Sequence, residues 1–293
     1  ISIPFFDFGG ILADDPNTEK AVLSKAIQIG RRIRAENIEL RNIKPLQSIS
    51  SNANKPKNSG DTDNAVSAKD EHILTRTHKV RMLLELPDSS ETLMKSFKSK
   101  LRSQIRKPLK EGLTSKVGRI ELLDDFYEVF AYNMRDLGSP VHSKRLMKSV
   151  LAKYPDTSRV VVVYQIDKPL ACSIVVGFQD TLENPWASSL REYSKLAPNM
   201  LLYWTMLKYA CERGYQYFDF GRSTPGEGTF KFKKQWGAEP VLLHWHYFQV
   251  YGNSAHRNAS ENETLEKAGD IWRKLPVAVT KIIGPRIRKH IGL

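Results

Sequence analysis

The chain has 293 residues, of which 41% are hydrophobic, and this is enough for one large domain or two of ordinary size. Global disorder is therefore excluded. The 45 Lys and Arg residues outnumber the 32 Asp and Glu residues and give a net charge of +13, which favours partners that carry phosphate, such as RNA, nucleotides or anionic lipid. Two cysteines without metal-ligand spacing, Cys172 and Cys211, argue against a disulfide framework and a structural zinc site, and point to the cytosol.

The N-terminal part reads as a small α/β unit, residues 1–88. A strand is expected over residues 3–12, followed by a helix that Asp15 caps and a short strand over 38–43. Residues 47–72 are dense in Ser, Asn, Lys, Asp and Gly, and we interpret them as a flexible surface insertion. A strand over 78–86 closes the unit. Because the chain begins at Ile1 rather than methionine, we expect residues to be missing upstream and this unit to be incomplete.

The following stretch, residues 89–252, alternates between helical and strand patterns. Apolar residues at i+4 spacing predict a helix from Ser90 that Pro108 ends or kinks one turn early. We expect a strand over residues 115–121, helices over 123–137 and 143–153, and a three-stranded antiparallel meander over 160–188. An apolar helix that Asn199 caps is expected over 200–213. A strand over 215–220, a short helix over 229–236 and a last strand over 240–250 follow it. This order predicts a mixed α/β fold.

The C-terminal stretch, residues 253–293, combines basic and apolar residues. Six basic residues follow Trp272 and alternate with Val, Leu and Ile, as in a helix that lies at a membrane surface. Pro276 and Pro285 are expected to break it into short pieces. We interpret it as a linker and a basic amphipathic tail that contacts an anionic membrane. No apolar run approaches the roughly 20 residues that span a bilayer.

An internal echo suggests duplication. Phe-Asp-Phe-Gly occurs at residues 6–9 and again at 218–221, each time at a strand end that opens into a glycine turn before a helix. The chain further resembles the FemAB family, and most closely the branch that accompanies exosortase and exopolysaccharide loci. The resemblance covers about residues 4–247 and is carried by residues 98–107, 133–138, 185–193, 198–203 and 219–237, with Phe232-Lys-Lys-Gln-Trp-Gly237 as the most specific part.

The resemblance implies tandem GNAT-like acyltransferase units and transfer of an acyl or aminoacyl group to an amine or hydroxyl. The acceptor would be a polysaccharide or peptidoglycan precursor, lipid-linked in some members, at the cytoplasmic face of the membrane. The donor stays open between acyl-CoA and aminoacyl-tRNA, and no tightly bound cofactor is expected. The chain lacks the coiled-coil arm of tRNA-using members, and its loop 222–228 misses the acetyl-CoA signature Q/R-x-x-G-x-G/A by one residue.

Lys233 is the leading catalytic residue. The resemblance implies that it contacts phosphate or the developing negative charge, whereas without the resemblance it reads as a solvated surface lysine. Gly221 and Gly228 flank a loop whose backbone N–H groups suit a phosphate or an oxyanion. Arg222 has two interpretations, a phosphate contact or an ion pair with Asp219 or Glu227. The resemblance adds further substrate-binding residues: Tyr203, Ser223, Phe232, Trp236 and Arg106.

The loop after the third meander strand supplies Arg191 as a substrate contact, Glu192 as a proton acceptor and Tyr193 as a substrate hydrogen-bonder, with an ordinary surface turn as the alternative. Asn199 reads both as a substrate contact and as a helix cap alone. His142 stands in a loop where an imidazole suits proton transfer. His244 and His246 share a strand face, but no third ligand accompanies them, so no metal site is predicted.

Covalent catalysis has no support, because neither G-x-S-x-G nor a Cys/His signature is present. Direct attack of the acceptor on a bound donor is the simplest mechanism. The alternative function is a non-catalytic module that binds RNA or an anionic glycolipid through a basic cleft, since no general base is compelling and the net charge is +13.

Overall fold

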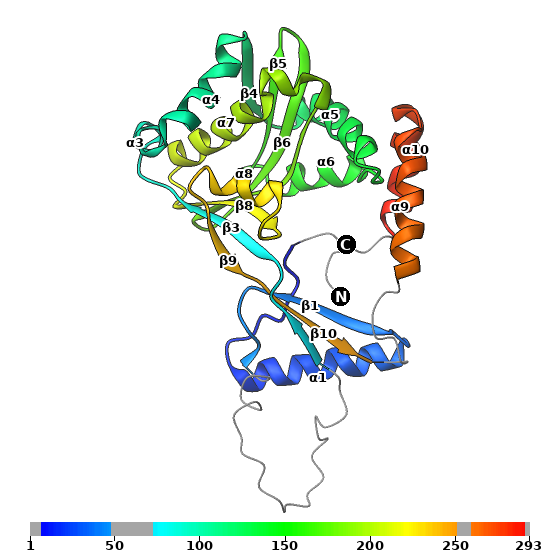
Figure 1. Ribbon diagram of the computed structural model, residues 1–293. Helices are drawn as coiled ribbons and strands as arrows, with labels where there is room; N and C mark the ends of the chain where they lie inside the picture. Colours follow the sequence, from blue (N-terminus) through cyan, green and yellow to red (C-terminus); the bar gives the residue numbers. More distant parts are fainter. Residues whose placement is uncertain (1–6, 48–72, 251–258, 291–293) are drawn as a thin grey trace, which may run out of the picture. The chain divides into compact units, whose positions relative to one another are not determined.

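The computed structural model describes residues 7–47, 73–250 and 259–290, and the chain divides into two compact units (Figure 1). The first unit combines Ile1–Arg81 with Arg222–Pro225 and Val241–Asn258, and the second combines the rest. These units are discontinuous in sequence, which differs from the linear boundaries at residues 88 and 252. The strand region that begins at Val241 returns to the first unit, and the C-terminal helices belong to the second.

The first unit is a three-stranded antiparallel sheet with one helix on it. The strands lie in the order β1 (Asn37–Asn42), β10 (His244–Gln249), β2 (Ile73–Arg76), and helix α1 (Pro16–Arg32) packs on β1. Asp15 caps α1 as predicted, with its carboxylate accepting from the N–H groups of Asn17 and Thr18. Apolar residues from both layers form the core: Leu23, Ile27, Leu40, Leu46 and Phe248.

Two expectations for this region fall largely outside the described residues. Of the insertion predicted at 47–72, residues 48–72 lie outside them, and so do residues 3–6 of the first predicted strand. The described part of that strand contains only an isolated antiparallel bridge between Gly9 and Arg41. Strand β2 was not predicted, because its four residues are too short for an alternation pattern to register.

The second unit is built on a seven-stranded mixed sheet, in the order β4-β5-β6-β7-β8-β3-β9. The strands are β3 (Val80–Glu85), β4 (Leu113–Gly118), β5 (Ser158–Gln165), β6 (Lys168–Phe178), β7 (Thr181–Ser189), β8 (Tyr217–Ser223) and β9 (Glu239–Leu242). Strands β4 to β7 are antiparallel neighbours, so the predicted meander is confirmed. The single strand expected over 240–250 is wrong, since β9 and β10 are separate strands in different sheets.

Helices cover both faces of this sheet (Figure 1). On one face lie α5 (Leu123–Asp136) and α6 (Lys144–Lys153), and the Cys172 thiol of β6 donates to the Phe126 carbonyl of α5. On the other lie α4 (Ser99–Lys110) and α7 (Pro198–Glu212). Helix α7 is buried along most of its length, as its apolar sequence predicted.

Three local expectations need correction. The helix predicted from Ser90 is two helices, α3 (Ser90–Ser96) and α4, because Phe97 adopts an extended conformation and packs its ring inside. Pro108 does not end α4, which continues to Lys110. Asn199 is not the cap of α7, because Ala197 occupies that position and Pro198 begins the helix.

The C-terminal stretch forms α9 (Ala259–Arg273) and α10 (Val277–Arg288), and α10 packs on α5. Pro276 stands between the two helices, as predicted, but Pro285 lies inside α10, so the predicted break at Pro285 is wrong. Gly284 lets α10 approach Val141 closely, since a Cβ at Gly284 would be 3.1 Å from Val141 Cγ1. The Arg288 guanidinium donates to Ser139 Oγ at 3.2 Å. Among the described helices, none has the length and apolar character that crossing a membrane requires.

Candidate functional site

The site lies in the second unit, where two parallel strands part. Strands β7 and β8 are paired only at Thr181–Tyr217, Leu182–Phe218 and Glu183–Asp219, although β7 continues to Ser189 and β8 to Ser223. Beyond Glu183 and Asp219 the two strands are no longer paired with each other. The strands therefore open an edge on which an extended ligand can form main-chain hydrogen bonds.

A bulge in β7 coincides with this opening. The register between β6 and β7 shifts between Ile174 and Val176, opposite Asn184 and Pro185. Proline has no N–H to donate, so it is tolerated at such an irregularity. Because an extra residue reverses the alternation, Asn184 and Trp186 point to opposite faces of the sheet despite their spacing. Asn184 thereby joins the α7 face, whereas Trp186 lies beside His142 on the other.

A buried polar chain connects this bulge to α7. Ser173 Oγ donates to Asn184 Oδ1 at 2.6 Å, and Asn184 Nδ2 donates to the Tyr203 hydroxyl at 3.4 Å. Burial raises the pKa of Tyr203 to about 12, so the hydroxyl stays protonated at any physiological pH. The Tyr203 ring stacks on Phe220 and meets Phe232 edge-on at 4.9 Å. These contacts hold the Tyr203 side chain in a defined position on the α7 face of the sheet.

Lys233 approaches the end of β8 from helix α8 (Gly228–Lys234). Its side chain is 8% exposed, and its ammonium donates to the Gly221 carbonyl at 3.1 Å. Gly221 has φ +74°, a left-handed conformation that favours glycine, and its N–H donates to the fully buried Asp219 carboxylate. Asp219 thus positions the turn, and the turn presents a carbonyl that holds the lysine. A buried ammonium with a defined position suits stabilisation of negative charge.

The structure brings several predicted residues together and leaves others apart. Lys233, Gly221, Tyr203, Phe232 and Trp236 share one cluster. The alternative for Lys233, a solvated surface lysine, is wrong.

The predicted residues Arg191, Glu192 and Tyr193 lie on a 3-10 helix (Arg191–Leu196) that follows β7. There Lys168 Nζ donates to the Tyr193 hydroxyl at 2.6 Å and lies 3.9 Å from the Glu192 carboxylate. Arg191 and Glu192 are exposed, and Asn199 is half-buried in the first turn of α7. Their predicted roles stay predictions.

Arg222 and Ser223 belong to the first unit. The Arg222 N–H and guanidinium contact the Asp7 carboxylate, at 3.0 and 3.4 Å, and the guanidinium lies 5.1 Å from the centre of the Trp245 ring. Asp7 belongs to the first copy of the Phe-Asp-Phe-Gly echo. Gly228 begins α8 in open space, and Arg106 is exposed on α4.

Two histidines singled out from the sequence lie in different units. His142 is buried and stacks on Phe130, and burial, together with the nearby Arg288, lowers its pKa to about 4. His246 Nδ1 lies 2.8 Å from Thr75 Oγ1 in the first unit. Within the described residues no three His, Cys, Asp or Glu side chains converge as metal ligands.

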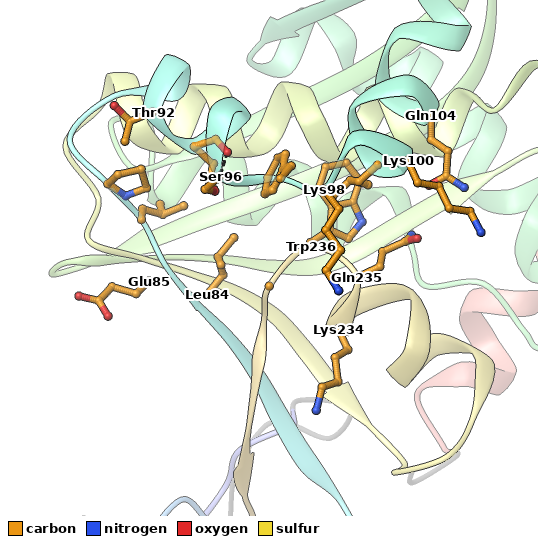
Figure 2. A pocket seen from close by; sticks show the side chains of 16 residues that line it. Leu84, Glu85, Thr92, Ser96, Lys98, Lys100, Gln104, Lys234, Gln235 and Trp236 are labelled. Atoms are coloured by element: carbon orange, nitrogen blue, oxygen red, sulfur yellow. Dashed lines mark hydrogen bonds between the residues drawn. The ribbon is translucent and has the colours of Figure 1, made fainter.

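A cavity of about 800 Å³ in the second unit was not found from the sequence (Figure 2). Its walls come from the end of β3, from α3, from the start of α4 and from residues 234–237, and Lys233 is not among the residues that line it. Its deeper lining is apolar and includes Leu84, Leu93, Phe97, Leu101 and Trp236. The only signal in the sequence was the apolar periodicity of residues 93–109, which indicates burial and not a hollow.

Comparison with known proteins supports the fold. Residues 95–234 match the model of the family described as "Acetyltransferase (GNAT) domain". A crystal structure of FemX has a TM-score of 0.57 at 16% sequence identity, covering 83% of this chain and 79% of that chain. A conserved protein of unknown function from Bacteroides thetaiotaomicron VPI-5482 has a TM-score of 0.54 at 11% identity, covering 79% and 75%. No curated protein matches. The predicted mixed α/β fold with a GNAT-like unit is therefore confirmed, and the FemX fold agrees with the FemAB resemblance.

Proposed function

We propose that this protein is a GNAT-type transferase that moves an acyl or aminoacyl group from an activated donor to an amine or hydroxyl of a cell-envelope precursor. The observation that carries the proposal is the parting of β7 and β8 after three paired residues, with the buried Lys233 ammonium at the end of β8. The GNAT match over residues 95–234 includes both strands and Lys233. The exosortase-associated branch and a polysaccharide or peptidoglycan acceptor follow from the sequence resemblance.

The donor is proposed to enter the opening in an extended conformation. A thioester donor such as acyl-CoA carries amide groups in its arm, and these suit hydrogen bonds to the backbone edges of β7 and β8. An aminoacyl ester on tRNA is the other donor class, and its phosphates suit the net charge of +13. In either case binding places the reactive carbonyl beside the acceptor and removes the entropy cost of their encounter.

The reaction is proposed as direct attack. The acceptor nitrogen or oxygen forms a bond to the donor carbonyl carbon, the carbonyl oxygen becomes an oxyanion, and the C–S or C–O bond to the donor then breaks. Lys233 stabilises the negative charge that develops in this step, and its contact with Gly221 holds the ammonium in place. Tyr203 is protonated because its pKa is about 12, so it serves as a hydrogen-bonding group of the site and not as a base. The acceptor proton is assigned to Glu192, the exposed carboxylate proposed from the sequence.

A donor screen tests the proposal. Purified full-length chain is incubated separately with acetyl-CoA, a long-chain acyl-CoA and charged tRNA, with hydroxylamine as a small nucleophilic acceptor, and products are followed by mass spectrometry. Turnover with one donor class supports transfer and identifies the donor. Tight binding of the charged tRNA without turnover of any donor would instead support the non-catalytic module, and contradict the enzyme.

A further inference from the structure

The cavity of the second unit has one strongly cationic end. Lys98 and Lys100, both exposed, lie there beside Gln104, whereas the carboxylate of Glu85 lies at the other end (Figure 2). In the described part of the chain no acidic side chain forms a salt bridge with either lysine. Two ammonium groups that form no ion pair with a described acidic side chain favour an anion at this end.

The same end is the start of a helix. Helix α4 has 12 residues and begins at Ser99, and no side chain caps it. The first N–H groups of a helix have no partner within it, and their dipoles favour negative charge. Because Lys98, Lys100 and Leu101 all line the cavity, this helix start borders it.

A third donor comes from Trp236, two residues beyond the end of α8. Trp236 lines the cavity, is 0% exposed, and its indole Nε1 has no hydrogen-bond acceptor among the described residues. A buried indole N–H normally finds an acceptor. Its ring is held by Phe97 at 5.6 Å and by Tyr203 at 6.1 Å, so the donor has a defined position.

We propose that this end of the cavity is a binding site for a phosphoryl group, carried either by a soluble phosphate ester or by a lipid headgroup. Lys98 and Lys100 supply charge, the start of α4 supplies backbone donors, and Trp236 supplies a neutral donor. Lys234 also lines the cavity, but Figure 2 shows it pointing away from Lys98, and its ammonium lies 5.9 Å from the Phe230 ring centre. Lys233 does not line the cavity, although Trp236 also contacts Tyr203 of the Lys233 cluster, and the proposal does not rest on the transfer reaction.

Two matched variants of the full chain test the site by calorimetric titration with inorganic pyrophosphate. Lys98→Gln/Lys100→Gln removes both cavity lysines, and Lys107→Gln/Lys110→Gln removes the same charge from exposed positions of α4 outside the cavity. We expect about 10- to 100-fold weaker binding in the first and less than about twofold in the second. Equal weakening of the two, or no pyrophosphate binding by the unchanged chain, would overturn the proposal.

Trp236 provides a second test of the site that does not depend on removing charge. The indole N–H resonance of Trp236, assigned with Trp236→Phe, is expected to shift when pyrophosphate is added to the ¹⁵N-labelled chain, and a resonance that does not move counts against the site. Vesicles of phosphatidylcholine with and without phosphatidic acid then separate the two sources. Sedimentation with phosphatidic acid that the cavity double variant abolishes identifies a lipid headgroup. Pyrophosphate binding without such sedimentation identifies a soluble ester.

Discussion

The two faces of the large sheet treat their buried polar groups differently. On the α5 face, the Cys172 thiol donates to a helix carbonyl and the neutral imidazole of His142 lies among aromatic rings. On the α7 face, Ser173, Asn184 and Tyr203 form a connected chain that leads to the opening between β7 and β8. Both faces bury polar groups, so burial alone does not distinguish them. The difference is that the polar chain of the α7 face reaches the edge where β7 and β8 part.

The largest effect should come from Lys233. We expect Lys233→Ala to slow transfer by about 30- to 1000-fold, equivalent to about 2 to 4 kcal/mol, because the lost ammonium stabilises charge that is greatest in the transition state. Lys231→Ala is the matched control, since Lys231 is exposed on the same helix. Steady-state rates with the donor found in the screen measure both. Equal transfer rates of the two variants would contradict a role of Lys233 in the reaction. They would also leave no functional difference between the α7 and α5 faces.

His142 gives the α5 face a stability that depends on pH. Its pKa is about 4 in the folded protein and ordinarily 6.5, so the unfolded chain takes up the proton first as pH falls. The contribution is present in full above pH 6.5 and is lost as pH falls toward 4, by about 2 to 3 kcal/mol.

Urea unfolding between pH 4 and 8 measures this loss, with His142→Phe as the comparison. The pH slope over that window should be smaller in the variant. An unchanged slope would mean that folding does not lower the pKa of His142 and that the α5 face is less closed than described.

Gly221 separates backbone strain from the placement of Lys233. Gly221→Ala, at φ +74°, should cost about 1 kcal/mol of unfolding free energy and should also slow transfer, because the carbonyl that holds Lys233 shifts. Gly214→Ala is the control, since Gly214 has φ +73° and open space around its Cβ position. Thermal melts and rates are compared in the two variants. If both lose activity alike, the turn matters for folding only.

The smallest stability effect is expected at the exposed cluster of Lys168, Glu192 and Tyr193. Because Lys168 and Glu192 are exposed and 3.9 Å apart, a double-mutant cycle with Lys168→Gln and Glu192→Gln should give a coupling below about 0.5 kcal/mol. Rates add the functional test. Glu192→Gln should slow transfer more than Lys168→Gln if the carboxylate accepts the acceptor's proton, and matching rates would contradict that role.

The local pattern of the chain determined much of this protein. The β-branched alternation and turn residues of 160–188 predicted the meander, and helix periodicity with caps predicted α1, α5 and α6, since these depend on neighbours close in sequence. The Phe232-Lys-Lys-Gln-Trp-Gly237 motif directed attention to Lys233 before its burial was known.

Tertiary structure alone decided the rest. Strand β3 lies between β8 and β9, and the strand predicted over 240–250 divides between two sheets, because strand partners are chosen by packing between residues far apart in the chain. The pairing of Arg222 with Asp7 joins positions 215 residues apart, and α10 survives Pro285 because it packs on α5. The opening between β7 and β8 and the cavity beside α4 are likewise absences of contact between distant segments, which no local pattern records.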